Sequence, residues 1–354
     1  MRAWLAFILP VSSLDMSVFL HARASAPSSP RARRPLTRAL LVFNPASRGG
    51  LRALSQVTRA LREAGVAFEV VETIGWSRPT EALRSRIAAG PSYDAVLALG
   101  GDGTAMETAS ALATLPDAPA LGIIAVGTGN VLARTIGVPR DPARAVHSLL
   151  DAETSPVDLG RIENGPAFAI GLGVGLDASM IAGASAVMKR RLGAVAYVWP
   201  ALRAGLRLER FHVSIEVDGT THDTEACSVL IANFGTVLGD MFCFGDGIAH
   251  HDGKLDVCVF SPMSLVDASR ILFRLLFGGV SQDRCVRTIR GERIRISTDV
   301  PRQVQADGEL LGLTPVSVQV EPAAVQLLVP RTPARRWRLR RSGQQVRPQL
   351  RIVR

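Results

Sequence analysis

Residues 97–112, LALGGDGTAMETASAL, join the end of an apolar run to a glycine-rich turn and a helical pattern. The run Ala95–Leu99 predicts a buried strand, and Met106–Leu115 predicts a helix. The turn between them, from Gly100 to Thr104, lets backbone N–H groups approach phosphate oxygens, and a helix N-terminus favours negative charge. Asp102 inside the turn offers the hard oxygen ligand that Mg²⁺ prefers. The stretch therefore predicts a phosphate-binding turn with a place for a cation.

Similar strand and helix patterns lie on both sides of this stretch. Strands are predicted at Ala39–Phe43, Phe68–Glu72 and Leu121–Val126, and helices at Leu51–Ala64, Pro79–Ala89 and Ala143–Leu150, the last with Asp141 as N-cap and Pro142 at N1. Continuous apolar strands that alternate with helices predict a parallel sheet covered on both faces.

Two further polar or glycine-rich turns follow predicted strands. One runs from Asn44 to Gly50, and the other is Gly127-Thr128-Gly129-Asn130. Ligands of open α/β sheets bind at the carboxyl ends of the strands. Because three such turns follow strands of one predicted sheet, we expect them to form one ligand-binding edge.

The second half of the chain has a different pattern. Phe211–Asp218 and Glu225–Ile231 flank the Asp218-Gly219 turn and predict a hairpin. More strands are predicted at Leu255–Phe260, Arg293–Ser297, Val304–Ala306 and Val316–Val320, and helices at Ala194–Leu208 and Leu265–Leu276. We expect an α/β domain at residues 38–156 and a mainly antiparallel β domain at 157–330.

Charge is concentrated at the two ends of the chain. The net charge is +10, of which residues 1–36 carry +4 and residues 331–354, with nine Arg, carry +9, so the body is weakly acidic. Basic ends are typical of chains that meet anionic surfaces.

No apolar stretch reaches the length of a membrane span, and the four cysteines without a CxxC pair indicate free thiols. Residues 1–21 resemble a weak signal peptide, with a start at Met16 or later as the alternative, and 22–37 are expected to be a disordered lead.

Several common nucleotide-binding and hydrolase motifs are missing. The only Gly-Lys pair, Gly253-Lys254, is followed by Leu255, so there is no Walker A sequence. No G-x-G-x-x-G follows the first strand, and no G-x-S-x-G elbow occurs.

The segments VFNPASRGG, LALGGDGTAMETASAL and AVGTGNVLARTIGVP resemble the nucleotide-binding signatures of the diacylglycerol kinase catalytic-domain family. GLGVGLDASM, AHHDGKLDVCVF and QADGELLG extend the resemblance to about Pro330. It implies an N-terminal α/β domain similar to those of NAD kinases and phosphofructokinases, a β-rich substrate domain, and ATP-dependent phosphorylation of a lipid hydroxyl.

The resemblance also implies roles for individual residues. The implied ATP-site residues are Asn44, Thr73, Gly100, Gly101, Asp102, Gly103, Thr104, Gly127, Thr128, Gly129 and Asn130. Asp252, with the carbonyls of Lys254 and Ala249, corresponds to a magnesium site of the second domain, and Asp177 to a contact with the lipid head group. Glu309, after the Asp307-Gly308 turn, corresponds to the proposed catalytic base, with Asp102 as the other candidate. The expected cofactors are ATP and Mg²⁺.

One position departs from the bacterial diacylglycerol kinases. After the G-T-x-N turn these kinases usually carry an Asp, and this chain has Val131. Diacylglycerol, a sphingoid base or a related lipid alcohol therefore all stay open as substrates. An NAD-kinase-like kinase of a soluble metabolite and an inactive membrane-binding regulator are the alternatives.

The remaining expectations concern location and partners. The tail from Arg331 to Arg354, which includes Trp337, is expected to bind an anionic membrane surface, which would place the protein in the cytoplasm at the inner membrane face. Nucleic acid is not expected as a partner. The oligomeric state is open, with a homodimer as one option.

Overall fold

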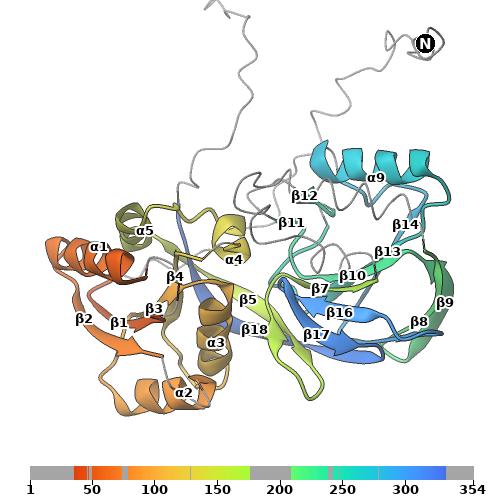
Figure 1. Cartoon of the computed structure of the whole chain (residues 1–354). Helices are drawn as coiled ribbons and strands as arrows, with labels where there is room; N and C mark the ends of the chain where they lie inside the picture. The colour runs from red at the N-terminus through yellow and green to blue at the C-terminus, as the bar shows by residue number, and fades with distance from the viewer. Residues whose placement is uncertain are drawn as a thin grey trace, which may run out of the picture.

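The computed structural model describes residues 36–331, except 46, 48–49, 74–78, 128, 176–208, 238–241, 246 and 278. The predictions for the N-terminal lead up to residue 35, Thr128, Asp177, the helix at 194–208 and the tail from residue 332 lie outside the described residues. Figure 1 shows a helix-covered half and a β-rich half joined by two long strands.

The first half is a parallel α/β unit, as the alternating pattern predicts. Its strands run in the order β2-β1-β3-β4, all parallel. Strands β3 and β4 are buried at every residue, because helices cover both faces. The elements are β1 (Arg38–Phe43), α1 (Gly50–Glu63), β2 (Ala67–Glu72), α2 (Pro79–Ala89), β3 (Ala95–Gly100), α3 (Asp102–Leu112) and β4 (Ala120–Ala125).

Two short helices complete this half, α4 (Val131–Thr135) and α5 (Pro142–Leu150). The predicted cap of α5 is confirmed: the Asp141 carboxylate accepts the N–H of Arg144 at 2.9 Å, and Pro142 follows at the first helical position.

Two long strands, β5 (Glu153–Ile162) and β18 (Val316–Val329), pair antiparallel and run from one half into the other. Near its C-terminal end β18 pairs parallel to β4, and near its start it pairs antiparallel to β15 (Arg293–Thr298). The predicted boundary at residue 156 therefore falls inside β5. The β5–β18 register shifts between Glu321 and Val325, where the chain bulges.

A buried carboxylate holds that bulge in place. Asp158 of β5 accepts the N–H of Ala323 in the bulge and the N–H of Gly253 in a neighbouring turn, each at 2.7 Å. Burial of this side chain raises the pKa of its carboxyl group. Asp158 thus ties the crossing strands to the second half.

The second half consists of two packed sheets. Strands β15, β8 and β9 continue the large sheet, and a six-stranded sheet has the order β14-β13-β10-β7-β16-β17. Apolar side chains of both sheets form one core between them. The remaining elements are β6 (Ala167–Phe168), β7 (Gly171–Gly175), β8 (Phe211–Val217), β9 (Thr220–Ala226), β10 (Ser228–Ala232), β11 (Thr236–Val237), β12 (Phe242–Cys243), β13 (Leu255–Phe260), α9 (Leu265–Phe277), β14 (Val286–Gly291), β16 (Gln303–Ala306) and β17 (Glu309–Leu313).

The predicted hairpin is correct at its turn and wrong in its second strand. Asp218 and Gly219 join β8 to β9, but the run predicted as one strand at Glu225–Ile231 is divided at Cys227. Strand β9 is an exposed edge of the large sheet, whereas β10 is buried at every residue in the middle of the other sheet. The chain therefore changes sheets at Cys227.

No helix in the described part of the chain has the length and apolar character that a membrane crossing requires.

Candidate functional site

The carboxyl ends of the parallel strands form one edge, as expected. The N–H of Thr73, after β2, donates to the carbonyl of Phe43 at the end of β1 at 2.9 Å. The N–H of Asn44 reaches the carbonyl of Leu99 in β3 at 3.4 Å, and the N–H of Val126, after β4, donates to the carbonyl of Gly100 at 2.9 Å. These bonds place Asn44, Thr73 and the Gly100 turn side by side.

Close backbone packing explains the glycines at this edge. A Cβ on Gly127 would lie 2.7 Å from the Cα of Gly101, and one on Gly129 would lie 2.8 Å from Oδ2 of Asp102. The turn after β4 therefore packs directly on the turn after β3. Side chains at these positions would push the two turns apart, so glycine is needed for packing at both.

Asp102 is the first residue of α3, and its carboxylate faces the next turn along the sheet. One carboxylate oxygen accepts the N–H of Leu132 at 3.4 Å. Burial raises the pKa of Asp102 most; the N–H groups of Val131, Leu132 and Asn130 lower it, and the charge of Glu309 raises it further. Asp102 is thus a partly buried acid that interacts electrostatically with an acid of the other domain.

Asn130 has a polar atom without a partner. Its backbone is left-handed, with φ of 50°, and its amide nitrogen donates to the carbonyl of Gly127 at 2.7 Å. Its Oδ1 is buried and accepts no hydrogen bond. A buried unsatisfied acceptor is costly, so this atom fits a ligand that brings an N–H or O–H donor.

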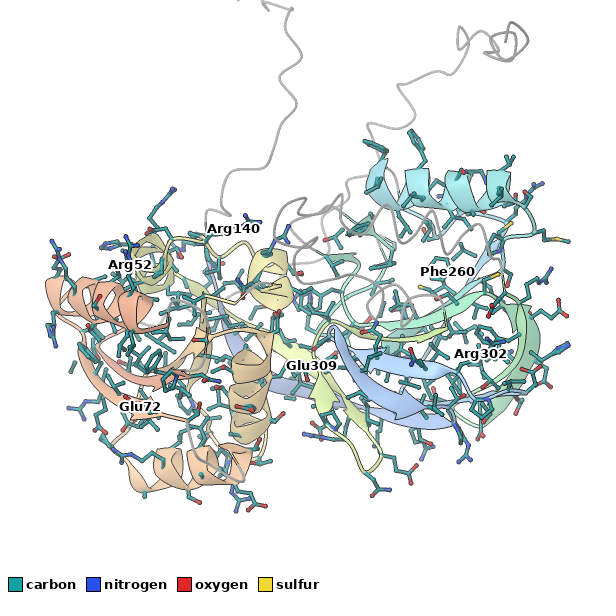
Figure 2. All side chains as sticks on the ribbon, viewed as in Figure 1. Arg52, Glu72, Arg140, Phe260, Arg302 and Glu309 are labelled. Carbon is teal, nitrogen blue, oxygen red and sulfur yellow. The ribbon has the colours of Figure 1, made fainter. Side chains whose placement is uncertain are left out.

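Glu309 reaches this site from the second domain. It opens β17 after the Asp307-Gly308 turn, and a Cβ on Gly103 would lie 3.6 Å from its Oε1. Figure 2 shows Glu309 at the junction of the two halves. The two acids that are expected to serve catalysis, Asp102 and Glu309, therefore come from different domains and lie beside the same turn, the one that begins at Gly100.

Asp307 is a residue whose side-chain role the sequence reasoning missed. Its carboxylate accepts the N–H groups of Ala169, Ile170 and Gly171 at 2.7, 2.9 and 3.0 Å. The pKa of Asp307 is raised to about 6. Burial is the main cause, and the charge of Asp102 adds to it, while the three N–H bonds lower the pKa by less. The motif QADGELLG predicts the turn. It does not show that the Asp307 carboxylate accepts N–H groups of residues 169–171, because those residues lie far away in the sequence.

Together these residues make a negatively charged centre. Burial raises the pKa of Glu107 on α3 most, and the charge of Glu309 raises it further. Asp102, Glu107, Asp307 and Glu309 are thus linked by mutual repulsion. The described residues do not gather three or more His, Cys, Asp or Glu side chains into a finished metal site. An excess of partly buried negative charge beside the edge formed by the glycine turns nevertheless fits a hard cation that arrives with a phosphate ligand.

The loop that the resemblance assigns to a second magnesium is contacted by a guanidinium group from strand β14. Arg290 makes two bonds to Asp256, at 3.0 and 3.1 Å, donates to the carbonyl of Gly247, and lies 3.6 Å from the Asp252 carboxylate. The other Asp252 oxygen accepts the N–H of Lys254 at 3.1 Å. The Arg290 guanidinium group already supplies positive charge beside this loop, so the predicted metal site at Asp252, Lys254 and Ala249 fits a dication poorly. It stays a prediction, and no step below depends on it.

The two adjacent histidines of this loop form a chain of ring contacts with Phe234. The His250 ring stacks on Phe234 with centroids 4.5 Å apart, and the His251 ring meets that of His250 edge-on at 4.8 Å. These contacts give the pair a packing role beside Asp158.

Two family models match the chain in succession. The diacylglycerol kinase catalytic domain matches residues 38–162, and the YegS C-terminal NAD kinase beta sandwich-like domain matches residues 171–329. The first match covers the edge formed by the glycine turns, and the second covers the sheet that carries Glu309.

Named relatives agree with these matches. A protein named diacylglycerol kinase from Bacillus subtilis is 28% identical over 283 residues, which are 79% of this chain and 92% of that protein. An uncharacterized protein, sll0036, from Synechocystis is 30% identical over 66% of this chain, and the match spans about half, 54%, of that protein's length.

Two solved structures from Bacillus anthracis have the same fold. They align with TM-scores of 0.70 and 0.64 at 26% and 23% identity, and each alignment covers 85% of this chain and 99% of the other. The second of these proteins is named a diacylglycerol kinase. The order of the two domains, the glycine turns at the strand ends and these matches lead to one conclusion: the chain belongs to the diacylglycerol kinase catalytic-domain family of lipid kinases.

Proposed function

We propose that this protein transfers the γ-phosphate of ATP to the hydroxyl group of a membrane lipid. The observation that carries the proposal is the meeting of Asp102, on the phosphate-binding edge, with Glu309 from the second domain. Phosphoryl transfer depends mainly on positioning and on neutralising charge. Two acids from different domains would position the reacting groups, and Asp102 would hold the cation that neutralises charge.

The first domain is suited to hold the nucleotide. Backbone N–H groups of the turns that begin at Gly100 and Gly127 would bind phosphate oxygens, and the unpaired Oδ1 of Asn130 would accept a donor from the ligand. Asp102 would hold Mg²⁺, which would neutralise the negative charge that develops during transfer. Val131, where the bacterial diacylglycerol kinases usually carry an Asp, leaves Asp102 as the acid next to this turn.

The second domain is suited to present the acceptor. Glu309 would accept the proton of the lipid hydroxyl as the oxygen attacks phosphorus. An ordinary carboxylate is a weak base at pH 7, so proton transfer to Glu309 would come late, in a loose transition state. Asp177, the expected head-group contact, belongs to the same proposal and lies outside the described residues.

The test is transfer of labelled phosphate from ATP to acceptors presented in parallel. Diacylglycerol, a sphingoid base, a mixed lipid extract and NAD would each be offered with Mg²⁺, and the products identified by mass spectrometry. A labelled lipid supports the proposal. Labelled NADP alone would replace it with an NAD-kinase-like function. That function is the main alternative because the second domain matches an NAD kinase beta sandwich-like model. No product from any acceptor would favour an inactive regulator.

Asp102→Asn is the matched control for that assay. The change keeps the size of the side chain and removes its charge, so the variant should fold and lose transfer by about 10²–10³-fold. Normal turnover by Asp102→Asn at saturating ATP would remove Asp102 from the mechanism.

A further inference from the structure

Helix α9 has apolar side chains on two opposite faces. Its inner face carries Ile271 and Leu275, which join a core cluster with residues of β10 and β13. Its outer face carries Val266, Phe273 and Phe277, which are 73%, 62% and 69% exposed. At 100° per residue, these three residues fall within a sector of about 40° on the side away from Ile271. A surface helix usually has polar residues there.

The exposed apolar residues around α9 form a local concentration. Among the described residues, eleven large apolar side chains are exposed, and five of them lie between residues 263 and 277. The other two of the five are Met263 and Leu265. The rings of Phe273 and Phe277 contact each other with centroids 4.8 Å apart. Figure 1 shows α9 along the outside of the second domain, and Figure 2 shows side chains projecting from it away from the sheets.

The charges beside this face are positive. Arg270 and Arg274 lie on one flank of the outer sector, and Arg284, 79% exposed, follows the helix. Their acidic partners are two buried carboxylates, Asp267 and Asp283. The exposed surface of α9 therefore carries guanidinium groups and no carboxylate.

We propose that the outer face of α9 docks on an anionic lipid bilayer. Exposed aromatic and aliphatic side chains on one side of a helix, with arginines at the edge, are typical of a helix that lies in the membrane interface. The apolar stripe enters the acyl boundary while the arginines meet anionic head groups. The inference rests on the proposed function, since an enzyme that acts on a membrane lipid must approach the bilayer. The surface is separate from the basic tail, which lies outside the described residues.

The test measures vesicle binding by the full chain. The variant is Phe273→Gln with Phe277→Gln, and the control is Leu51→Gln with Val300→Gln, two exposed apolar residues at other places. Vesicles of phosphatidylcholine with and without phosphatidylglycerol are sedimented at moderate salt. We expect the α9 variant to bind anionic vesicles at least about tenfold more weakly than the wild type, and the control to bind like the wild type.

Four outcomes would overturn the inference. Equal vesicle binding by the α9 variant and the wild type would do so directly. A lower melting temperature with unchanged vesicle binding would mean that another part of the chain covers the face, and a change from dimer to monomer with unchanged vesicle binding would mean that a second copy covers it. A similar loss in the control variant would make the effect non-specific.

A second assay separates this inference from the proposed function. Phosphate transfer to a short-chain lipid dispersed in detergent should be equal in the wild type and the α9 variant, because no bilayer is needed. If neither protein phosphorylates any lipid but only the wild type binds vesicles, docking stands and the lipid kinase proposal fails. If both phosphorylate the dispersed lipid and bind vesicles equally, the kinase stands and docking on α9 fails.

Discussion

Replacing Asp307 with Asn should change how the stability of the protein depends on pH. In the folded protein, burial and the nearby Asp102 raise the pKa of Asp307 from 3.8 to about 6. An acid with a raised folded pKa destabilises the folded state once it ionises there, so stability is greater at low pH and is lost as pH rises from about 4 to about 6. Asn is neutral at every pH and lacks this dependence.

The size of the effect follows from the pKa difference. A rise from 3.8 to about 6 corresponds to about 3 kcal/mol between the ends of that range. Asp307 keeps part of its surface accessible to water, so this figure is an upper limit. The Asn variant keeps one acceptor oxygen, for the N–H groups of Ile170 and Gly171. Its NH2 group replaces the oxygen that accepts the N–H of Ala169, and that loss is the same at every pH.

The assay is urea denaturation of both proteins at several pH values between 4 and 7. The free energy of unfolding of Asp307→Asn, relative to the wild type, should decrease by up to about 3 kcal/mol as the pH falls. Asp223→Asn on the exposed strand β9 is the control for removing a carboxylate elsewhere. A relative stability that is flat with pH, or that increases toward pH 4, would refute the account of Asp307 as a carboxylate strained by burial.

Three further changes test the rest of the site. Glu309→Gln should lower kcat by about 10²–10⁴-fold with ATP affinity unchanged, and equal losses in both would indicate a structural role instead. Gly127→Ala should raise the KM for ATP about tenfold, because the new Cβ would lie 2.7 Å from the Cα of Gly101 and displace a phosphate-binding turn; wild-type kinetics would show that the turns can separate freely. Arg290→Met should lower the free energy of unfolding by about 2–4 kcal/mol in chemical denaturation, since it leaves the buried Asp256 without its guanidinium partner. Restoration of that stability by millimolar Mg²⁺ would show that the loop accepts a metal once the arginine is gone, whereas full stability without metal would mean that the ion pair contributes little.

Most of the first domain could be predicted from the sequence because its signals are local. Ala95–Leu99 is an apolar run bounded by glycine, and the structure extends it by one residue to Gly100. Met106–Leu115 was a less accurate prediction, because the helix begins at Asp102, inside the turn. Glycine and aspartate suggested a loop, but Gly101 acts as the N-cap and the packed Gly127 turn supports helical geometry directly after it.

The second domain was harder because its pairings are not local. Strand β9 and strand β10 are separated by one residue and belong to different sheets, so a continuous run of strand-forming residues hides the division. The contact between Asp307 and residues 169–171 spans more than 130 positions. Apolar residues also lie on both faces of α9, with Ile271 buried and Phe273 exposed, so the sequence predicts the helix without showing which apolar face is covered.

The crossing of β18 limits how the chain can be divided into working pieces. The catalytic-domain match ends at residue 162, yet Leu327 pairs beside β4, and Leu327 and Leu328 are buried in the core of the first domain. A fragment that stops at residue 162 would leave β4 as an open edge and lose apolar contacts from that core. The first domain thus needs β18 to be complete, and a ribosome must reach residue 329 before either half can finish folding.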